Sequence, residues 1–165
     1  MVTRARWEWR TFGEGAEAGA AAIERLEPTG EQVSDERYLV RRGAATVKVR
    51  AGLIDIKRLL AVGEDGLEQW YPVLKAPFPL DAATVAAVRD ALGLPAEPGA
   101  GDGWSEEALV ASLTAPGAGV RDVPVHKRRV RYVVNGCTAE LTDVTAGGHR
   151  TRTLAVESED AAAVL

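Results

Sequence analysis

The sequence predicts an α+β fold, an antiparallel eight-stranded tunnel-like β-barrel with flanking helices. Segments in which polar and apolar residues alternate recur along most of the chain, which is typical of half-buried strands. Two-residue turn signals such as Asn135-Gly136 stand between successive segments and favour antiparallel pairing. Apolar residues recur at helical spacing in only a few short segments. Roughly eight antiparallel strands can close into a barrel, whose inner and outer side chains then alternate along every strand.

The first predicted strand covers residues 3–12, TRARWEWRTF. Its aromatic side, with Trp7 and Trp9, is expected to pack in a core, and its other side is charged. An Ala- and Glu-rich helix is expected over residues 13–26. A second strand is expected over residues 36–42, beginning near Gln32. The charged side of the first strand carries Arg4, Arg6, Glu8 and Arg10, and the apolar face of the helix carries Ala18, Ala21, Ala22, Ile23 and Leu26.

A hairpin is predicted from Ala44 to about Val62, with its tight turn at Ala51-Gly52. Side chains alternate between the two faces of a strand, so the apolar residues fall on one face and mixed, mostly cationic residues on the other. The next strand, residues 67–75, contains Pro72, which suits an edge or a bulge. The polar residues of the hairpin are Thr46, Lys48, Arg50, Asp55 and Lys57, and the apolar ones are Val47, Val49, Ile54 and Ile56.

At about residues 80–116 the apolar residues change from strand spacing to helical spacing, which predicts a helical insertion. Asp81 is expected to cap a helix that ends near Leu92, and Ser105 one that ends near Leu113. Neither helix has an apolar core of its own, so we expect one domain over residues 1–165. The inserted helices suit a cover over a tunnel mouth or a contact in a homodimer.

Strands return at Val120, with Lys127, Arg129 and Arg131 on one face. The Asn135-Gly136 turn leads to a strand over residues 137–144, and a last strand covers residues 150–157. Ser158 is expected to cap a final helix, Glu159 to Leu165. A helix this short has little stability alone, so a clipped C-terminus is one interpretation of it.

Composition excludes several classes of protein. A net charge of −4 argues against a nucleic-acid partner, because such domains are usually strongly basic. No apolar segment approaches the roughly 20 residues of a membrane span, and the N-terminus lacks a signal-peptide core. We therefore expect a cytoplasmic protein with no membrane contact. The single Cys137 is expected to be a buried thiol in a reducing compartment, with a reactive nucleophile as the alternative.

Cations and carboxylates collect on one side of several predicted strands. Arginine and lysine bind phosphoryl oxygens through charge-assisted hydrogen bonds, and carboxylates among them suit Mg²⁺, which bridges to substrate phosphates. If these faces point inward, the lumen suits a linear phosphate chain; the alternative is a solvated outer face. The cations are Arg6, Arg10, Lys48, Arg50, Lys57, Lys75, Lys127, Arg129 and Arg131. The carboxylates are Glu8, Asp55, Glu140 and Glu157, with Glu159 if the last strand continues.

Short motifs in strand order carry a family resemblance: Trp7-Glu8-Trp9-Arg10, Val47-Lys48-Val49-Arg50, Lys127-Arg128-Arg129 and Val156-Glu157-Ser158-Glu159. The chain resembles the CYTH superfamily of triphosphate tunnel metalloenzymes, in particular a divergent bacterial exopolyphosphatase-like branch. The resemblance implies an eight-stranded tunnel, a triphosphate or polyphosphate substrate, and Mg²⁺ or Mn²⁺. The family's first-strand signature is Glu-x-Glu-x-Lys, whereas this chain has Arg6-x-Glu8-x-Arg10. A cation in place of a carboxylate is expected to weaken metal binding and to strengthen phosphate binding.

Two functions follow from these expectations. The first is a metal-dependent phosphohydrolase that binds an anionic small-molecule substrate with the cations above. Its catalytic carboxylates would be Glu8, Glu157 and Glu159, and its metal ligands Glu8, Glu140, Glu157 and Glu159. The second is a non-catalytic module of the same fold that binds polyphosphate, a nucleotide or a phosphorylated partner. In that case Glu8 serves as an ion-pair partner of its neighbouring arginines.

Overall fold

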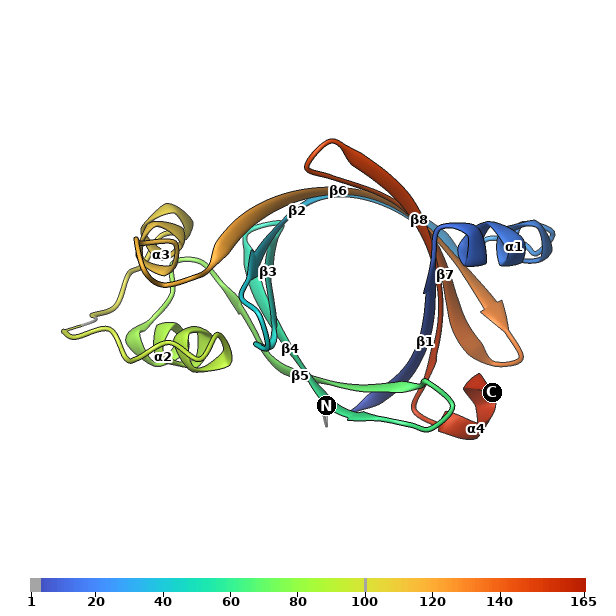
Figure 1. Cartoon of the computed structure of the whole chain (residues 1–165), viewed down its shortest axis with the longest axis horizontal. Coiled ribbons are helices and arrows are strands. Elements are labelled where there is room, and N and C mark those ends of the chain that lie inside the picture. Colours follow the sequence, from blue (N-terminus) through green and yellow to red (C-terminus); the bar gives the residue numbers. More distant parts are fainter. Residues whose placement is uncertain (1–3, 100) are drawn as a thin grey trace. The chain divides into compact units, whose positions relative to one another are not determined.

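The computed structural model describes residues 4–99 and 101–165. Its eight strands form a closed antiparallel barrel in the hydrogen-bonded order β1-β5-β4-β3-β2-β6-β7-β8, which confirms the predicted fold class. Figure 1 labels the elements. The strands are β1 (Arg6–Phe12), β2 (Gly30–Val40), β3 (Thr46–Arg50), β4 (Leu53–Val62), β5 (Glu68–Pro77), β6 (Arg121–Val134), β7 (Cys137–Ala146) and β8 (His149–Ser158). The helices are α1 (Glu14–Ile23), α2 (Ala82–Ala91), α3 (Glu106–Leu113) and α4 (Ala161–Val164).

Both predicted hairpin turns are present. Asn135 and Gly136 have φ angles of 48° and 80°, and Ala51 and Gly52 have φ angles of 50° and 71°. Two consecutive left-handed residues make a turn whose twist matches that of the flanking strands. Each turn therefore determines which residues of its two strands lie opposite each other: Val134 pairs with Cys137, and Arg50 with Leu53.

Contacts divide the chain into two compact units. We call residues Met1–Asp35, Leu59–Tyr71 and Val125–Leu165 the first unit, and residues Glu36–Arg58 and Pro72–Pro124 the second unit. Because the boundaries fall inside strands, both units contribute to the same strand order. Each unit has its own apolar cluster.

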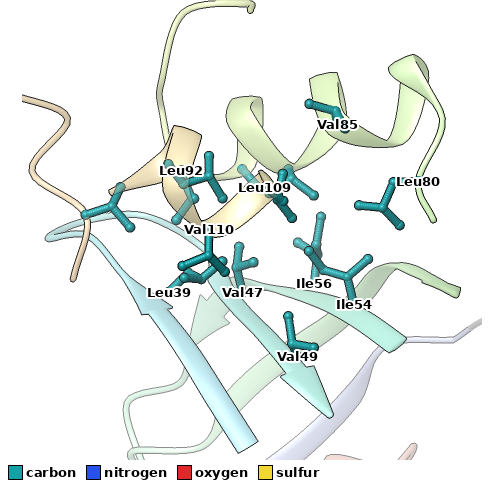
Figure 2. Packing of buried hydrophobic residues seen from close by; sticks show 14 residues of the cluster. Leu39, Val47, Val49, Ile54, Ile56, Leu80, Val85, Leu92, Leu109 and Val110 are labelled. Atoms are coloured by element: carbon teal, nitrogen blue, oxygen red, sulfur yellow. The ribbon is translucent and has the colours of Figure 1, made fainter. Parts of the chain in front are cut away.

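In the second unit, helices α2 and α3 pack on one face of β3 and β4 (Figure 2). Asp81 caps α2 by accepting a hydrogen bond from Thr84 N at 2.7 Å, and Ser105 caps α3 by accepting one from Ala108 N at 3.2 Å, as predicted. Burying a valine or leucine side chain contributes about 1.5–3 kcal/mol. The sheet contributes Val47, Val49, Ile54 and Ile56 to this cluster, and the helices contribute Val85, Val88, Leu92, Leu109, Val110 and Leu113.

In the first unit, α1 packs on β7 and β8, but with a different face from the predicted one. Ala16, Ala20 and Ile23 are buried, whereas Ala18, Ala21, Ala22 and Leu26 are exposed. Gly19 explains the difference, because a Cβ atom there would collide with the Leu154 side chain. The helix thus approaches the sheet closely through its small residues. The sheet residues of this cluster are Tyr132, Ala139, Leu141 and Leu154.

Two other local predictions are wrong. Trp9 is 39% exposed and Trp7 is only half-buried, so the aromatic side of β1 is not a core face, because the apolar cluster gathers under α1 without either tryptophan. The final helix is a single turn capped by Asp160, not by Ser158, whose hydroxyl accepts from Asp160 N. Cys137 is buried as predicted, and its thiol donates to Ala163 O at 3.1 Å. None of the helices in the described ranges is long and apolar enough to cross a membrane.

Candidate functional site

The helices identify which strand faces point into the barrel. An eight-stranded barrel has an interior just wide enough for side chains, so packed helices must lie outside it. Val47 and Val49 on β3 contact the helical cluster, and Lys48 and Arg50 therefore project from the opposite, inner face. In the first unit, Leu141 lies under α1, so Glu140 and Thr142 beside it also point inward.

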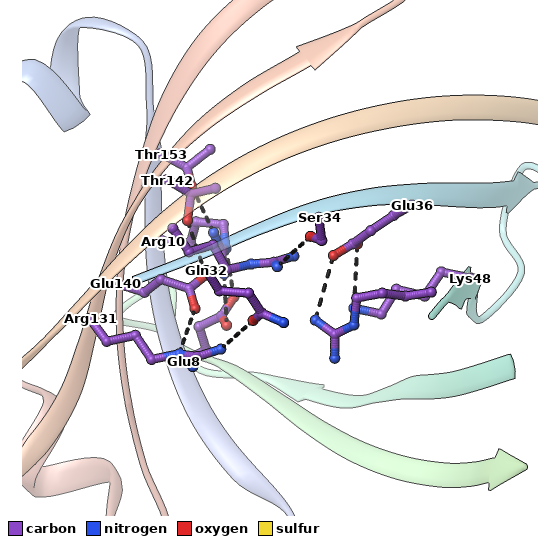
Figure 3. Close-up of polar contacts among 12 residues, drawn as sticks. Glu8, Arg10, Gln32, Ser34, Glu36, Lys48, Arg131, Glu140, Thr142 and Thr153 are labelled. Atoms are coloured by element: carbon purple, nitrogen blue, oxygen red, sulfur yellow. Dashed lines mark hydrogen bonds and ion pairs between the residues drawn. The ribbon is translucent and has the colours of Figure 1, made fainter. Parts of the chain in front are cut away.

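In the second unit, the inner face centres on a buried carboxylate. The Glu36 side chain is fully buried, with Oε2 3.6 Å from Lys48 Nζ and Oε1 3.5 Å from Arg50 Nη1 (Figure 3). Glu36 lies directly opposite Arg50, and Lys48 directly opposite Asp55. Lys57 shares the face of Asp55, two residues along β4. Among these five residues, three cations against two carboxylates leave one excess positive charge.

Burial affects the lysine most. The side chain of Lys48 is 12% exposed. Burial lowers the pKa of its ammonium group below the ordinary value of 10.5, while the Glu36 carboxylate partly offsets that shift. The positive charges of Arg50 and Lys57 lower the Lys48 pKa further. An additional anion on this face would therefore stabilise the protonated lysine.

In the first unit, one inner-face group joins β1 and β8. Arg10 donates from Nε and Nη2 to the two carboxylate oxygens of Glu8, at 2.9 and 3.1 Å, and from Nη1 to Thr153 Oγ1 at 2.9 Å. Arg6 Nε lies 3.6 Å from Glu157 Oε1, and this nitrogen is buried without a hydrogen-bond partner in the described part of the chain. The group thus contains two arginine–carboxylate pairs and one unused buried donor.

A second group in the first unit centres on Glu140. Its carboxylate lies 3.4 Å from Arg129 Nε and 3.6 Å from Arg131 Nε, and it accepts a hydrogen bond from Thr142 at 3.0 Å. Arg129 is buried and donates to Ser34, and Arg131 donates to Gln32, at 3.0 and 2.9 Å (Figure 3). Hydrogen bonds from β2 therefore hold both guanidinium groups in place.

The remaining predicted site residues are Lys75, Lys127 and Glu159. Lys127 lies on β6 opposite Val144 and is half-buried. Lys75 lies exposed on β5. Glu159 follows β8 and pairs with Arg4 at 3.0 Å, with both side chains at least half exposed.

Five polar residues in these groups had not been singled out in the sequence: Gln32, Ser34, Glu36, Thr142 and Thr153. The first three alternate along β2, and this period-two pattern of polar residues could have revealed a shared polar face. Thr142 shares the strand face of Glu140, and Thr153 that of Glu157, so the same alternation could have revealed both threonines.

The predicted metal ligands do not fit a metal site built from protein groups alone. Among residues 4–99 and 101–165, no three His, Cys, Asp or Glu side chains are grouped so as to hold an ion. Each of the four predicted carboxylates contacts an arginine instead. Glu8 contacts Arg10, Glu157 contacts Arg6 and Glu159 contacts Arg4, while Glu140 contacts both Arg129 and Arg131.

Comparison with known proteins identifies the fold. No family model matches the sequence, and no curated protein matches it. A solved structure from Hippeastrum, of a candidate adenylyl cyclase with a dominant triphosphatase activity, superposes with a TM-score of 0.52 at 13% identity, covering 94% of this chain and 80% of that one. A candidate adenylate cyclase from Bacillus halodurans superposes with a TM-score of 0.52 at 9% identity, covering 97% and 83%. At these identities the likeness establishes a shared fold.

Proposed function

We propose that the protein binds a linear polyanion of the triphosphate or polyphosphate class through the basic inner faces of its strands. The observation that carries this proposal is the placement of Lys48 and Arg50, both half-buried, on the strand face opposite α2 and α3, in a chain whose net charge is −4. Buried cations cost free energy unless they have partners. Glu36 supplies part of that partnership for Lys48 and Arg50, and phosphoryl oxygens would supply the rest.

Two features favour an anionic ligand over a purely structural network. Arg6 Nε is buried without an acceptor among the described residues, so the guanidinium group of this half-exposed side chain is incompletely compensated. The lowered pKa of Lys48, caused first by burial, means that its positive charge lacks full compensation. An anionic oxygen beside either side chain would offset the cost at that place.

The test uses two adjacent lysine and arginine residues of β4. Lys57 shares the inner face of Asp55, whereas Arg58 points outward to Asp90 on α2, with 3.6 Å between Nη2 and Oδ2. Each substitution by methionine removes one positive charge, so the net charge changes equally. We expect Lys57→Met to weaken tripolyphosphate binding in calorimetry about tenfold, and Arg58→Met to leave it unchanged.

If the two variants lost the same affinity for tripolyphosphate, the loss would reflect overall charge alone, and that result would refute an inner-face site. No binding of tripolyphosphate by the folded wild-type protein would refute the proposed function itself.

Hydrolysis of the bound chain is the second candidate, favoured by the triphosphatase activity that the Hippeastrum structure's description names. It would require Mg²⁺ or Mn²⁺ at the predicted carboxylates, and these are paired with arginines. The test is release of inorganic phosphate from tripolyphosphate under each metal. Turnover that is lost in Glu8→Gln would support hydrolysis, and no turnover with either metal would leave binding as the function.

A further inference from the structure

Two of the predicted metal ligands face each other across a strand pair. Glu8 on β1 lies directly opposite Glu157 on β8. Directly opposite residues in an antiparallel pair have Cβ atoms about 4.5–5.5 Å apart and project from the same face, and like charges so placed repel. Mg²⁺ and Mn²⁺ are commonly bound by one or two such carboxylates together with substrate phosphates.

Each carboxylate of this pair already has a cation beside it. Arg10 contacts Glu8 with two hydrogen bonds, at 2.9 and 3.1 Å, and Arg6 Nε lies 3.6 Å from Glu157. Both arginines lie on β1, two residues before and two residues after Glu8. The two guanidinium groups balance the charges of Glu8 and Glu157. Glu68 on β5 also lies opposite Glu8, but its carboxylate accepts a hydrogen bond from Trp70 Nε1 at 3.0 Å. The Glu8–Arg10 contact is bidentate, which is the strong form of this ion pair.

We propose that Arg6 and Arg10 act as counter-cations of the Glu8–Glu157 pair and prevent it from binding divalent metal ions, so that the polyanion binds without a metal. The second half of this inference rests on the proposed function. A divalent ion would have to shed water and displace a guanidinium group from carboxylates whose charges Arg6 and Arg10 already balance. The Arg6 side chain is 41% exposed, so its guanidinium group can also donate to a phosphoryl oxygen.

The first experiment needs no phosphate ligand. Binding of Mn²⁺ to the protein alone is followed by electron paramagnetic resonance of the free ion. We expect no saturable binding to the wild type, and at least about tenfold tighter binding to the double variant Arg6→Met/Arg10→Met, because two carboxylates then lose their cations. The matched control, Arg4→Met/Arg58→Met, also removes two arginines. Their carboxylates, Glu159 and Asp90, are not cross-strand partners, so we expect no gain.

Saturable Mn²⁺ binding to the wild type that Glu8→Gln abolishes would overturn the inference, and so would an equal gain in the two double variants. The wild-type and Glu8→Gln measurements decide the question even if a double variant does not fold, which circular dichroism would report.

The second experiment measures tripolyphosphate binding in EDTA and in excess Mg²⁺. We expect equal or tighter binding in EDTA, because Mg²⁺ neutralises the ligand before the arginines can. Binding that appears only with Mg²⁺ would overturn the inference. Absence of binding under both conditions would refute the proposed function and leave the Mn²⁺ result standing.

Discussion

The Glu36→Gln substitution tests the buried ion pairs directly. It removes one negative charge and keeps the side-chain volume, which leaves Lys48 and Arg50 facing an uncharged amide. The Glu36 side chain is fully buried, whereas those of Lys48 and Arg50 are 12% and 25% exposed. Breaking a fully buried pair costs about 3–5 kcal/mol, so partial exposure of the two partners places the expected loss at about 3 kcal/mol. For a chain of this size, that loss lowers the melting temperature by about 6–12 °C.

The same unit provides a control in Asp90→Asn. The Asp90–Arg58 pair has the same 3.6 Å separation as Glu36–Lys48, but its side chains are 81% and 50% exposed. Exposed pairs contribute about 0–1 kcal/mol. The two ion pairs therefore differ in burial but not in the distance between their charges.

The assay is urea unfolding of both variants and the wild type, followed by circular dichroism. We expect an unchanged slope of the free energy against urea and a lower midpoint for Glu36→Gln alone. The reasoning fails if Glu36→Gln loses no more free energy of unfolding than Asp90→Asn, since burial would then not govern the cost.

Three other substitutions test the local structure. Gly136→Ala should lower the free energy of unfolding, measured in urea, by about 1–2 kcal/mol, because the φ of 80° at this position disfavours a Cβ atom. Gly30 has similarly open surroundings but no left-handed φ, so Gly30→Ala should leave the free energy of unfolding unchanged. Equal losses in the two variants would contradict this reasoning. Ser105→Ala should cost about 1 kcal/mol through loss of the α3 cap, and an unchanged midpoint would show that the cap is dispensable. Burial lowers the pKa of Lys48 in the folded state below its unfolded value of 10.5. At a pH between these two pKa values the unfolded chain binds more protons than the folded chain, so the free energy of unfolding rises with pH. The free energy of unfolding of the wild type minus that of Lys48→Met should therefore increase from neutral pH toward 10.5, and a flat or falling difference would contradict the shift.

Local sequence patterns predict those features of the structure that depend only on residues close together in the chain. Alternation along β3 and β6 correctly groups Lys48 with Arg50 and Arg129 with Arg131, because a strand sends successive side chains to opposite faces. The turn at Asn135-Gly136 follows from the backbone freedom of those two residues. The caps Asp81 and Ser105 follow from short hydrogen bonds within one helical turn.

Contacts between distant segments were decided only by the tertiary structure. The sequence placed Trp9 in a core and Ala18 on the packed face of α1, but close approach at Gly19 selects another face of the helix, and the apolar cluster gathers under it. No local signal pairs Arg6 with Glu157, or brings Arg131 and Gln32 together. By itself, the sequence determined which residues share a strand face. Barrel closure and helix packing decided which faces are internal and which carboxylates face arginines, because those depend on contacts between residues far apart in the chain.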